Sequence, residues 1–237
     1  MPVLAFEVIA VPVLAYVAVA VEGYLLGSIP TGYLVAKAKG IDIRSTGSGN
    51  IGATNAMRVL GKPAGIFVMI VDVLKGYAAC KLTPLIFNWL FPNWCGQDND
   101  FGALSLEIQT RLYVIAGIFA VFGHNYTCWL KFKGGKGIAT TAGVYFLLTP
   151  WALLFALAVF ILTVLITRYV SVGSIIAAIA LPVAVWFINE NMFYENTLLR
   201  IVTIALCAMA IYKHKSNIKR LMAGTESRFG KKPEAAK

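Results

Sequence analysis

Seven apolar segments, separated by short polar connections, constrain the fold of this chain more than any other feature. They lie at residues 3–27, 63–91, 110–130, 137–149, 151–167, 172–189 and 197–212. With 59% hydrophobic residues and a mean hydropathy of +0.74, the chain has more apolar surface than one soluble core can hide. A helix needs about 20 apolar residues to span a bilayer. The pattern therefore predicts an all-α integral membrane protein with about seven transmembrane helices.

The fourth apolar segment, 137–149, is short for a span. We expect it either to extend back through the preceding glycines or to be re-entrant. The first segment contains Glu7 and Glu22 and lacks a basic region before it, so we expect a retained transmembrane helix rather than a cleaved signal peptide.

The chain reads as one membrane domain, residues 1–230, followed by a polar tail at 231–237 that we expect to be disordered. The longest connection outside the membrane is 92–107, and it is the best candidate for a mobile loop.

Basic residues sort to one side of the membrane if all seven segments cross. Seventeen of the 21 Lys and Arg residues then lie on the side that holds the C-terminus. The positive-inside rule predicts that the N-terminus is outside and the C-terminus is in the cytoplasm. This sorting, rather than a single basic patch, argues against nucleic acid as the partner of a chain with net charge +10. The other side receives mainly acids, at Glu7, Asp98, Asp100, Glu107, Glu190 and Glu195.

The first polar motif is RSTGSGNIGATNAMR at 44–58, a glycine-rich stretch with an arginine at each end. Backbone N–H groups bared by glycine, together with arginines, are suited to binding an anion. A plain turn does not require so many hydroxyl and amide side chains, so we favour a ligand-binding interpretation. The candidate residues are Arg44, Ser48, Gly49, Asn50, Thr54, Asn55 and Arg58.

Part of this motif has helical character. Residues 50–60 are too polar to span the membrane, and we expect a short interfacial or re-entrant helix that Gly61 and Pro63 end. Upstream, GSIPTG at 27–32 predicts an interruption of the first membrane helix.

The second motif is GGKG at 134–137. It lacks the G-x-x-x-x-G-K-[ST] pattern of a nucleotide-binding phosphate loop. Lys136 is the best single cationic ligand for a phosphate, although an anchor at the membrane surface is the simpler alternative. We expect Gly134, Gly135 and Gly137 to expose N–H groups and allow a ligand to approach closely.

The third motif follows the last apolar segment. His214 and Asn217 are three residues apart and share a face of a helix. Glu226 is a candidate ligand, with the alternative that it holds an arginine in place. Ser174 either reaches the same site or caps the helix that begins near it.

Other polar residues give weaker signals. Asp72 and Lys75 are three apart in an apolar helix, where they can pair, and we interpret them as structural, with a functional role as the alternative. His124 and Cys128 are spaced like two metal ligands, but two ligands make no zinc site, and we predict no bound metal. The four cysteines give no disulfide framework, and the H-x-x-x-x-D acyltransferase signature is absent.

Four stretches in this order, GSGNIGATNAMR, GGKGIAT, YVSVGS and HKSNIKRLMAGTE, resemble the bacterial acyl-phosphate:glycerol-3-phosphate acyltransferase (PlsY) family. The resemblance covers Gly27 to about Lys231. It implies a multi-helix enzyme of the bacterial inner membrane that moves a fatty acyl group from acyl phosphate to the 1-hydroxyl of glycerol 3-phosphate. Lysophosphatidic acid and phosphate are the implied products, in phospholipid synthesis.

The resemblance also implies which residues act. The functional serine and arginine would be Ser48 and Arg58, and the glycine loop would be 134–137 with Lys136. The C-terminal motif would be His214, Asn217 and Glu226.

The residues themselves suit this chemistry. An acyl phosphate is already activated, so an enzyme needs to hold two anionic substrates together and orient one hydroxyl. No Ser–His–Asp or Cys–His set can be assembled from the motifs. We therefore expect direct transfer without a covalent intermediate or a cofactor, at the cytoplasmic face, by a monomer that contacts membrane lipid. A transporter would instead gather polar residues near the bilayer midplane, and a scaffold would not need three anion-binding motifs.

Overall fold

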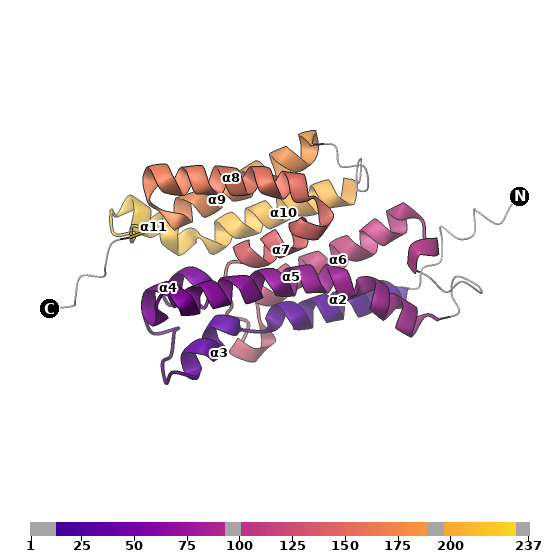
Figure 1. Ribbon diagram of the computed structural model, residues 1–237, viewed down its shortest axis with the longest axis horizontal. Coiled ribbons are helices and arrows are strands. Elements are labelled where there is room, and N and C mark those ends of the chain that lie inside the picture. The colour runs from indigo at the N-terminus through magenta and orange to yellow at the C-terminus, as the bar shows by residue number, and fades with distance from the viewer. Residues whose placement is uncertain (1–12, 93–100, 189–196, 231–237) are drawn as a thin grey trace, which may run out of the picture.

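The computed structural model describes residues 13–92, 101–188 and 197–230, which form an elongated bundle of α-helices (Figure 1). The predictions for residues 3–12, for the tail at 231–237 and for residues 93–100 of the connection at 92–107 lie outside the described residues.

Every one of the seven apolar segments contains a helix. The helices that correspond to them are α2 (Val13–Ser28), α5 (Lys62–Leu90), α6 (Leu106–Asn125), α7 (Ile138–Leu148), α8 (Pro150–Thr167), α9 (Val170–Phe187) and α10 (Thr197–Lys213). Shorter helices lie between or after them: α3 (Thr31–Lys37), α4 (Ala53–Leu60), α11 (Lys215–Met222) and the 3-10 helices η2 (Phe101–Ala103) and η3 (Cys128–Leu130).

Five helical stretches in the described residues are long and apolar enough to cross a membrane. They are Val13–Lys37, Lys62–Leu90, Leu106–Leu130, Pro150–Thr167 and Val170–Phe187. Helices α10 and α11, which are bent by 51° at His214, provide a sixth if the pair is one span. The all-α, multi-pass membrane fold is therefore confirmed, and the described residues hold five candidate spans, or six if the bent pair is one; the prediction of seven crossings is not tested by this count.

Helix α7, the fourth predicted segment, has 11 residues and is too short to be a candidate span by itself. At 1.5 Å per residue it is about 16 Å long, roughly half the thickness of the hydrocarbon core. Gly137 immediately before it has a φ of +82°, in the left-handed region, so the helix does not continue back through the glycines. One of the two predicted alternatives for this segment is thus wrong. A buried face of α7 packs against α5, where Gly76 lets the Thr140 carbonyl approach closely.

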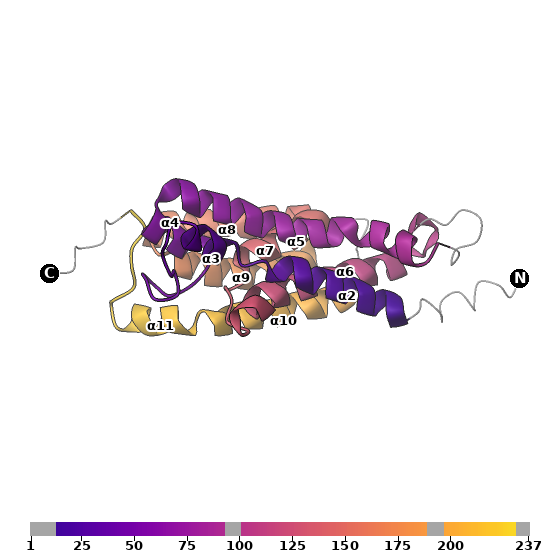
Figure 2. The same cartoon turned by 90° about the horizontal axis from the view of Figure 1, so that it is seen from below.

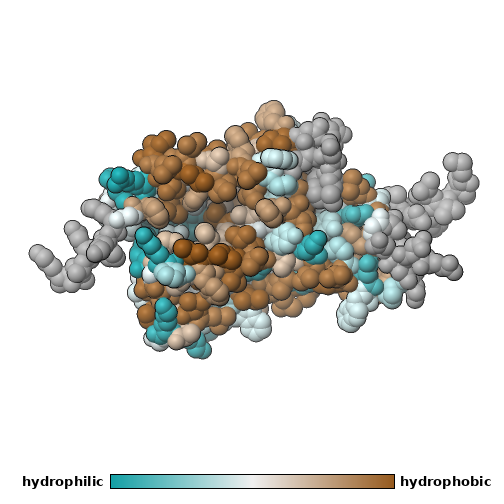
Figure 3. Space-filling view, viewed as in Figure 1, coloured by the Kyte–Doolittle hydropathy of each residue, from teal (hydrophilic) through white to brown (hydrophobic). Residues whose placement is uncertain are grey.

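Large apolar side chains point outward from the bundle, and apolar residues cover most of the face in Figure 3. Ile166 and Phe187, for example, are 81% and 79% exposed. An apolar surface of this extent is unfavourable in water and is the expected surface of a protein solvated by lipid.

The polar elements gather at one end of the bundle. In both views α3, α4 and α11 lie at the same end (Figures 1 and 2). An apolar cluster beneath the loop that joins α3 to α4 holds this end together, with Ile43, Ile51, Ala56, Val68 and Leu130 buried in it. The sequence motifs at 44–58 and 214–226 are thereby brought to one end, as the distribution of charge predicts.

Two local predictions for this end are confirmed. The chain breaks between α2 and α3 within GSIPTG, and α4 forms within residues 50–60. Gly61, with a φ of +91°, ends α4. Pro63 does not end it, because proline fits the first turn of a helix and lies in the first turn of α5.

Candidate active site

The first motif folds as a loop organised around the side chain of Asn55, which is 2% exposed. Its Oδ1 accepts a hydrogen bond from the Ser48 N–H at 2.8 Å, and its Nδ2 donates to the carbonyls of Thr46 at 3.1 Å and Asn50 at 2.8 Å. Asn55 was predicted as a substrate ligand. In the structure the Asn55 amide instead forms hydrogen bonds with backbone groups of the loop. Asn55 therefore sets the shape of the site and does not line it.

Neighbouring residues complete the turn. Gly47 and Gly49 have φ values of +64° and +70°, which glycine adopts without strain. A Cβ on Gly47 would overlap the Asn55 amide. Asn50 Oδ1 accepts from the Gly52 N–H at 2.9 Å, just before α4, so Asn50 also has a role in the fold of the loop.

Arg44 is held at the surface by Asp42, a residue for which the sequence suggested no role. The guanidinium donates to the Asp42 carboxylate from Nε at 3.0 Å and from Nη2 at 2.9 Å, and it lies 4.9 Å from the ring centroid of Tyr33. These hydrogen bonds lower the pKa of Asp42. Arg44 is exposed and oriented, but its charge is partly matched by the carboxylate.

A cavity of about 430 Å³ lies between this loop and the glycine loop at 131–137. Asp42, Arg44, Ser45, Gly49, Ile51, Lys133 and Gly134 line it. The first and second motifs, about 90 residues apart in the chain, therefore share one surface.

The glycine loop is anchored to the end of α6. The N–H of Gly135 donates to the His124 carbonyl at 2.9 Å, and that of Gly134 donates to the Asn125 carbonyl at 3.2 Å. The prediction that these two N–H groups are open to a ligand is wrong. The two glycines are needed for another reason, because a Cβ on either would overlap α6 residues.

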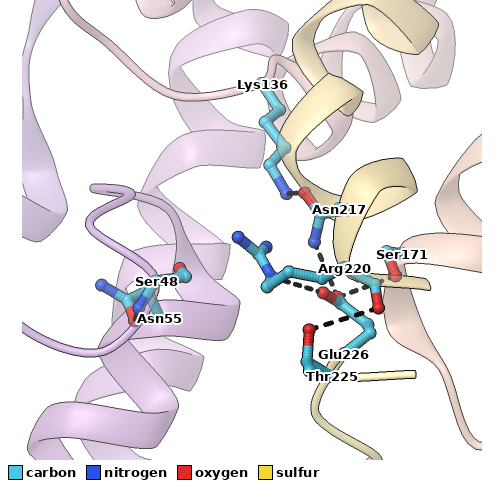
Figure 4. Close-up of polar contacts among 8 residues, drawn as sticks. All are labelled: Ser48, Asn55, Lys136, Ser171, Asn217, Arg220, Thr225 and Glu226. Carbon is cyan, nitrogen blue, oxygen red and sulfur yellow. Dashed lines mark hydrogen bonds and ion pairs between the residues drawn. The ribbon is translucent and has the colours of Figure 1, made fainter. Parts of the chain in front are cut away.

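Lys136 extends from this loop into a hydrogen-bonded network with α11 (Figure 4). Its Nζ donates to Asn217 Oδ1 at 2.6 Å, and Asn217 Nδ2 donates to Glu226 Oε1 at 2.7 Å. Ser171 Oγ donates to the same carboxylate oxygen at 2.9 Å, and Arg220 Nε donates to Glu226 Oε2 at 2.7 Å. We call these five residues the Lys136–Glu226 network.

The network keeps its charges in a partly desolvated setting. The pKa of Lys136 is lowered to about 8, mainly by burial; Glu226 opposes this lowering, and the positive charges of Arg220 and Arg58 add to it. Burial acts to raise the pKa of Glu226, but the hydrogen bonds from Asn217, Arg220 and Ser171 hold it below its ordinary value. Glu226 therefore holds an arginine in place, one of the two interpretations that the sequence allowed.

The first motif faces this network without being bonded to it in the described residues. Figure 4 shows Ser48 and Asn55 on one side and Lys136, Asn217 and Arg220 on the other. Arg58 projects from α4 close enough for its charge to act on Lys136. Thr54 is exposed on the same helix, and Ser48 is half-buried.

Two predicted residues have no hydrogen bond to the network among the described residues, although the charges of Lys136 and Glu226 act on the pKa of His214. Ser174 donates its hydroxyl to the Val170 carbonyl of its own helix, at 2.9 Å, so it neither reaches the network nor caps α9, the two alternatives for Ser174. Ser171 bonds to Glu226 instead. His214, 2% exposed, lies at the bend between α10 and α11 with Nδ1 2.7 Å from the Ala210 carbonyl. Burial lowers its pKa to about 4, so its ring is neutral near pH 7.

Arg220 is the main residue that sequence reasoning missed. It is three residues after Asn217, a spacing that places both on one face of α11. Together the cations and amides form a site able to bind anionic groups such as phosphates at one end of a membrane-embedded bundle.

Comparison with known proteins identifies the family of this chain. Residues 17–224 match the sequence model of the family described as glycerol-3-phosphate acyltransferase. The glycerol-3-phosphate acyltransferase of Geotalea daltonii is 43% identical over 209 residues, which cover 88% of this chain and 95% of the relative. That of Chlorobaculum tepidum is 41% identical over 243 residues, covering 92% and 99%.

Two crystal structures of PlsY, described as an integral membrane glycerol 3-phosphate acyltransferase, share the fold. The glycerol 3-phosphate form has a TM-score of 0.74 and 36% sequence identity, and covers 91% of this chain and 96% of that one. The lysophosphatidic acid form has a TM-score of 0.71, with the same identity and coverage of 91% and 95%. The match along most of its length, together with the shared fold, shows that this chain belongs to the glycerol-3-phosphate acyltransferase family, whose PlsY members are integral membrane proteins.

Proposed function

We propose that this protein transfers a fatty acyl group from acyl phosphate to the 1-hydroxyl of glycerol 3-phosphate, giving lysophosphatidic acid and phosphate for phospholipid synthesis. It acts as a monomer without a cofactor. Its site faces the cytoplasm from the bacterial inner membrane.

The observation that carries this proposal is the convergence of Lys136, Arg220 and Arg58 on one partly buried region. Both proposed substrates carry a phosphate, and holding the two together requires positive charge that offsets their repulsion. The PlsY structures described with glycerol 3-phosphate and with lysophosphatidic acid support this acceptor and this product.

In the proposed reaction, the glycerol hydroxyl oxygen forms a bond to the acyl carbonyl carbon, and the bond from that carbon to the phosphate oxygen breaks. Phosphate leaves with the electron pair. Lys136 and Arg220 bind the phosphate groups, while Ser48 and Asn217 orient the reacting atoms. The hydroxyl proton passes to a phosphate oxygen of a substrate, whose second pKa is about 6.

The test is turnover of purified protein with glycerol 3-phosphate and either acyl phosphate or acyl-CoA. We expect activity with acyl phosphate alone, sequential kinetics, and no acyl group bound to the protein. Activity with acyl-CoA but not with acyl phosphate would refute acyl phosphate as the donor. Ping-pong kinetics with an acyl group trapped on Ser48 would refute direct transfer.

His214→Gln tests the proton acceptor. His214 is buried and bonds to a carbonyl of its own helix, so we expect this variant to keep turnover within about fivefold of the wild type, because a single neutral hydrogen bond contributes only about 1 kcal/mol. The shape of the pH–rate profile should not change. Loss of the acidic limb of the profile in a folded variant would instead identify His214 as the base.

The pKa of Lys136 predicts how activity depends on pH. The amine is charged below about pH 8 and neutral above it, so its phosphate contact is present at low pH and lost as the pH rises. We expect kcat/KM to fall as the pH rises through about 8. Lys136→Arg should move this fall to higher pH, because guanidinium remains charged. An alkaline limb that is the same in both proteins would rule out Lys136 as its source.

Charge sorting predicts the membrane topology. Single cysteines at Glu107 and Lys133, in a protein without its native cysteines, should react with an impermeant thiol reagent from opposite sides of the membrane. We expect Glu107→Cys to be labelled from outside intact cells and Lys133→Cys only after permeabilisation. Labelling of both from the same side would contradict the proposed orientation.

A further inference from the structure

Three ionisable side chains form a buried cluster inside the bundle, away from the Lys136–Glu226 network. Asp72 and Lys75 belong to α5 and His124 to α6, and each is 5% exposed or less. Lys75 Nζ lies 2.9 Å from Asp72 Oδ1, and His124 Nδ1 lies 3.6 Å from the same oxygen. The predicted pairing of Asp72 and Lys75 is therefore present, with the imidazole as a third member.

Pairing alone does not explain why these residues are there. Ionisable side chains inside membrane-spanning helices are costly and usually serve a function. A buried ion pair is often no more stabilising than apolar residues of the same volume. The contacts of the cluster indicate what it does.

The imidazole of His124 lies directly against the glycine loop. A Cβ added to Gly135 would overlap this ring, with Nε2 as the nearest atom. The His124 carbonyl also accepts the Gly135 N–H, at 2.9 Å. Since Gly135 precedes Lys136, the position of the ring sets where the backbone of Lys136 begins.

On its other side, the cluster is hydrogen-bonded to the break between α2 and α3. Lys75 Nζ donates to the Ile29 carbonyl at 2.9 Å, in the break between α2 and α3. The Thr127 hydroxyl donates to the adjacent Ser28 carbonyl at 2.6 Å, which ties the same break to the turn after α6. The cluster thus links α5, α6 and the break between α2 and α3 beside the glycine loop.

We propose that Asp72, Lys75 and His124 are positioning residues for acyl transfer. The carboxylate of Asp72, fixed by Lys75, orients the imidazole of His124, and the imidazole supports Gly135 so that Lys136 meets Asn217 and a bound phosphate. This inference rests on the proposed function, in which Lys136 binds phosphate.

His124→Phe tests the proposal, because it keeps a flat ring against Gly135 but removes the nitrogen that faces Asp72. We expect kcat/KM to fall about 10- to 100-fold, as is typical when a reacting group is displaced by about 1 Å. The midpoint of thermal unfolding should remain near that of the wild type. Thr83→Val is the matched control, since Thr83 is buried on α5 and its hydroxyl bonds only to its own helix in the described structure.

A double-mutant cycle separates positioning from general stability. If the cluster acts through Lys136, His124→Phe should have little further effect in a Lys136→Ala background. Multiplicative losses in the two backgrounds would overturn the proposal. If His124→Phe does not fold, the double variant Asp72→Asn with Lys75→Met replaces it, because it removes both charges at nearly constant volume. This double variant should also have little further effect in a Lys136→Ala background.

Calorimetric titration with inorganic phosphate requires no acyl donor. We expect His124→Phe to weaken phosphate binding about tenfold, whereas Thr83→Val should leave it unchanged. If the wild type binds phosphate but does not use acyl phosphate, the proposal that acyl phosphate is the donor fails. The positioning role of the cluster is still tested, because this titration compares phosphate affinities only. Unchanged phosphate affinity in His124→Phe would overturn the role of the cluster.

Discussion

Lys136→Ala should lower kcat/KM at least ten- to a hundredfold in a protein that still folds in the membrane. The substitution removes a charge-assisted contact to phosphate, for which about 1.5–3 kcal/mol is typical. It also removes the hydrogen bond that Lys136 Nζ donates to Asn217 Oδ1 at 2.6 Å. Steady-state kinetics with both substrates varied would measure the loss.

The control for this variant is Lys219→Ala, which removes the same charge from an exposed position on α11. We expect it to behave like the wild type, since its long-range effect is screened by salt. Equal kinetics for Lys136→Ala and Lys219→Ala would reduce Lys136 to a membrane-surface anchor.

Glu226→Ala should lower activity about a hundredfold and also destabilise the protein. The carboxylate accepts hydrogen bonds from Ser171, Asn217 and Arg220 at the same time. Its removal leaves these donors without their shared acceptor, at a cost of about 1–3 kcal/mol for a buried group. It also frees Asn217, which aligns Lys136.

Glu226→Gln separates the two effects. Its amide oxygen can still accept from Ser171 and Asn217, but the ion pair with Arg220 is lost. We expect a smaller fall in activity than in Glu226→Ala and an unfolding midpoint between those of Glu226→Ala and the wild type. A Glu226→Ala protein with normal kinetics and stability would show that Glu226 has no part in catalysis.

Much of the site was predictable because local sequence carries strong signals. Glycines beside arginine and lysine are typical of anion-binding loops, and the stretches at 44–58 and 134–137 were identified as candidates in this way. The pairing of Asp72 with Lys75 followed from helical spacing alone. These inferences depend on neighbours within a few residues.

The roles of single residues within those stretches were less predictable. Asn55 was taken for a ligand, but its amide is used by carbonyls of its own loop. Gly134 and Gly135 were expected to offer N–H groups, but these are bonded to the end of α6. A sequence shows that a polar group is present, whereas the group it bonds depends on what the fold brings near it.

The sequence by itself determined the membrane fold, the helical segments and the end of the bundle that carries positive charge. Hydropathy predicts the helices because an apolar segment in lipid must satisfy its backbone hydrogen bonds as a helix, and the positions of Lys and Arg predict the charged end. Only the tertiary structure decided that Ser171 rather than Ser174 meets Glu226, 55 residues after Ser171, and that Lys136 meets Asn217 across 81 residues. Such pairings depend on how helices pack against one another, which local periodicity does not encode.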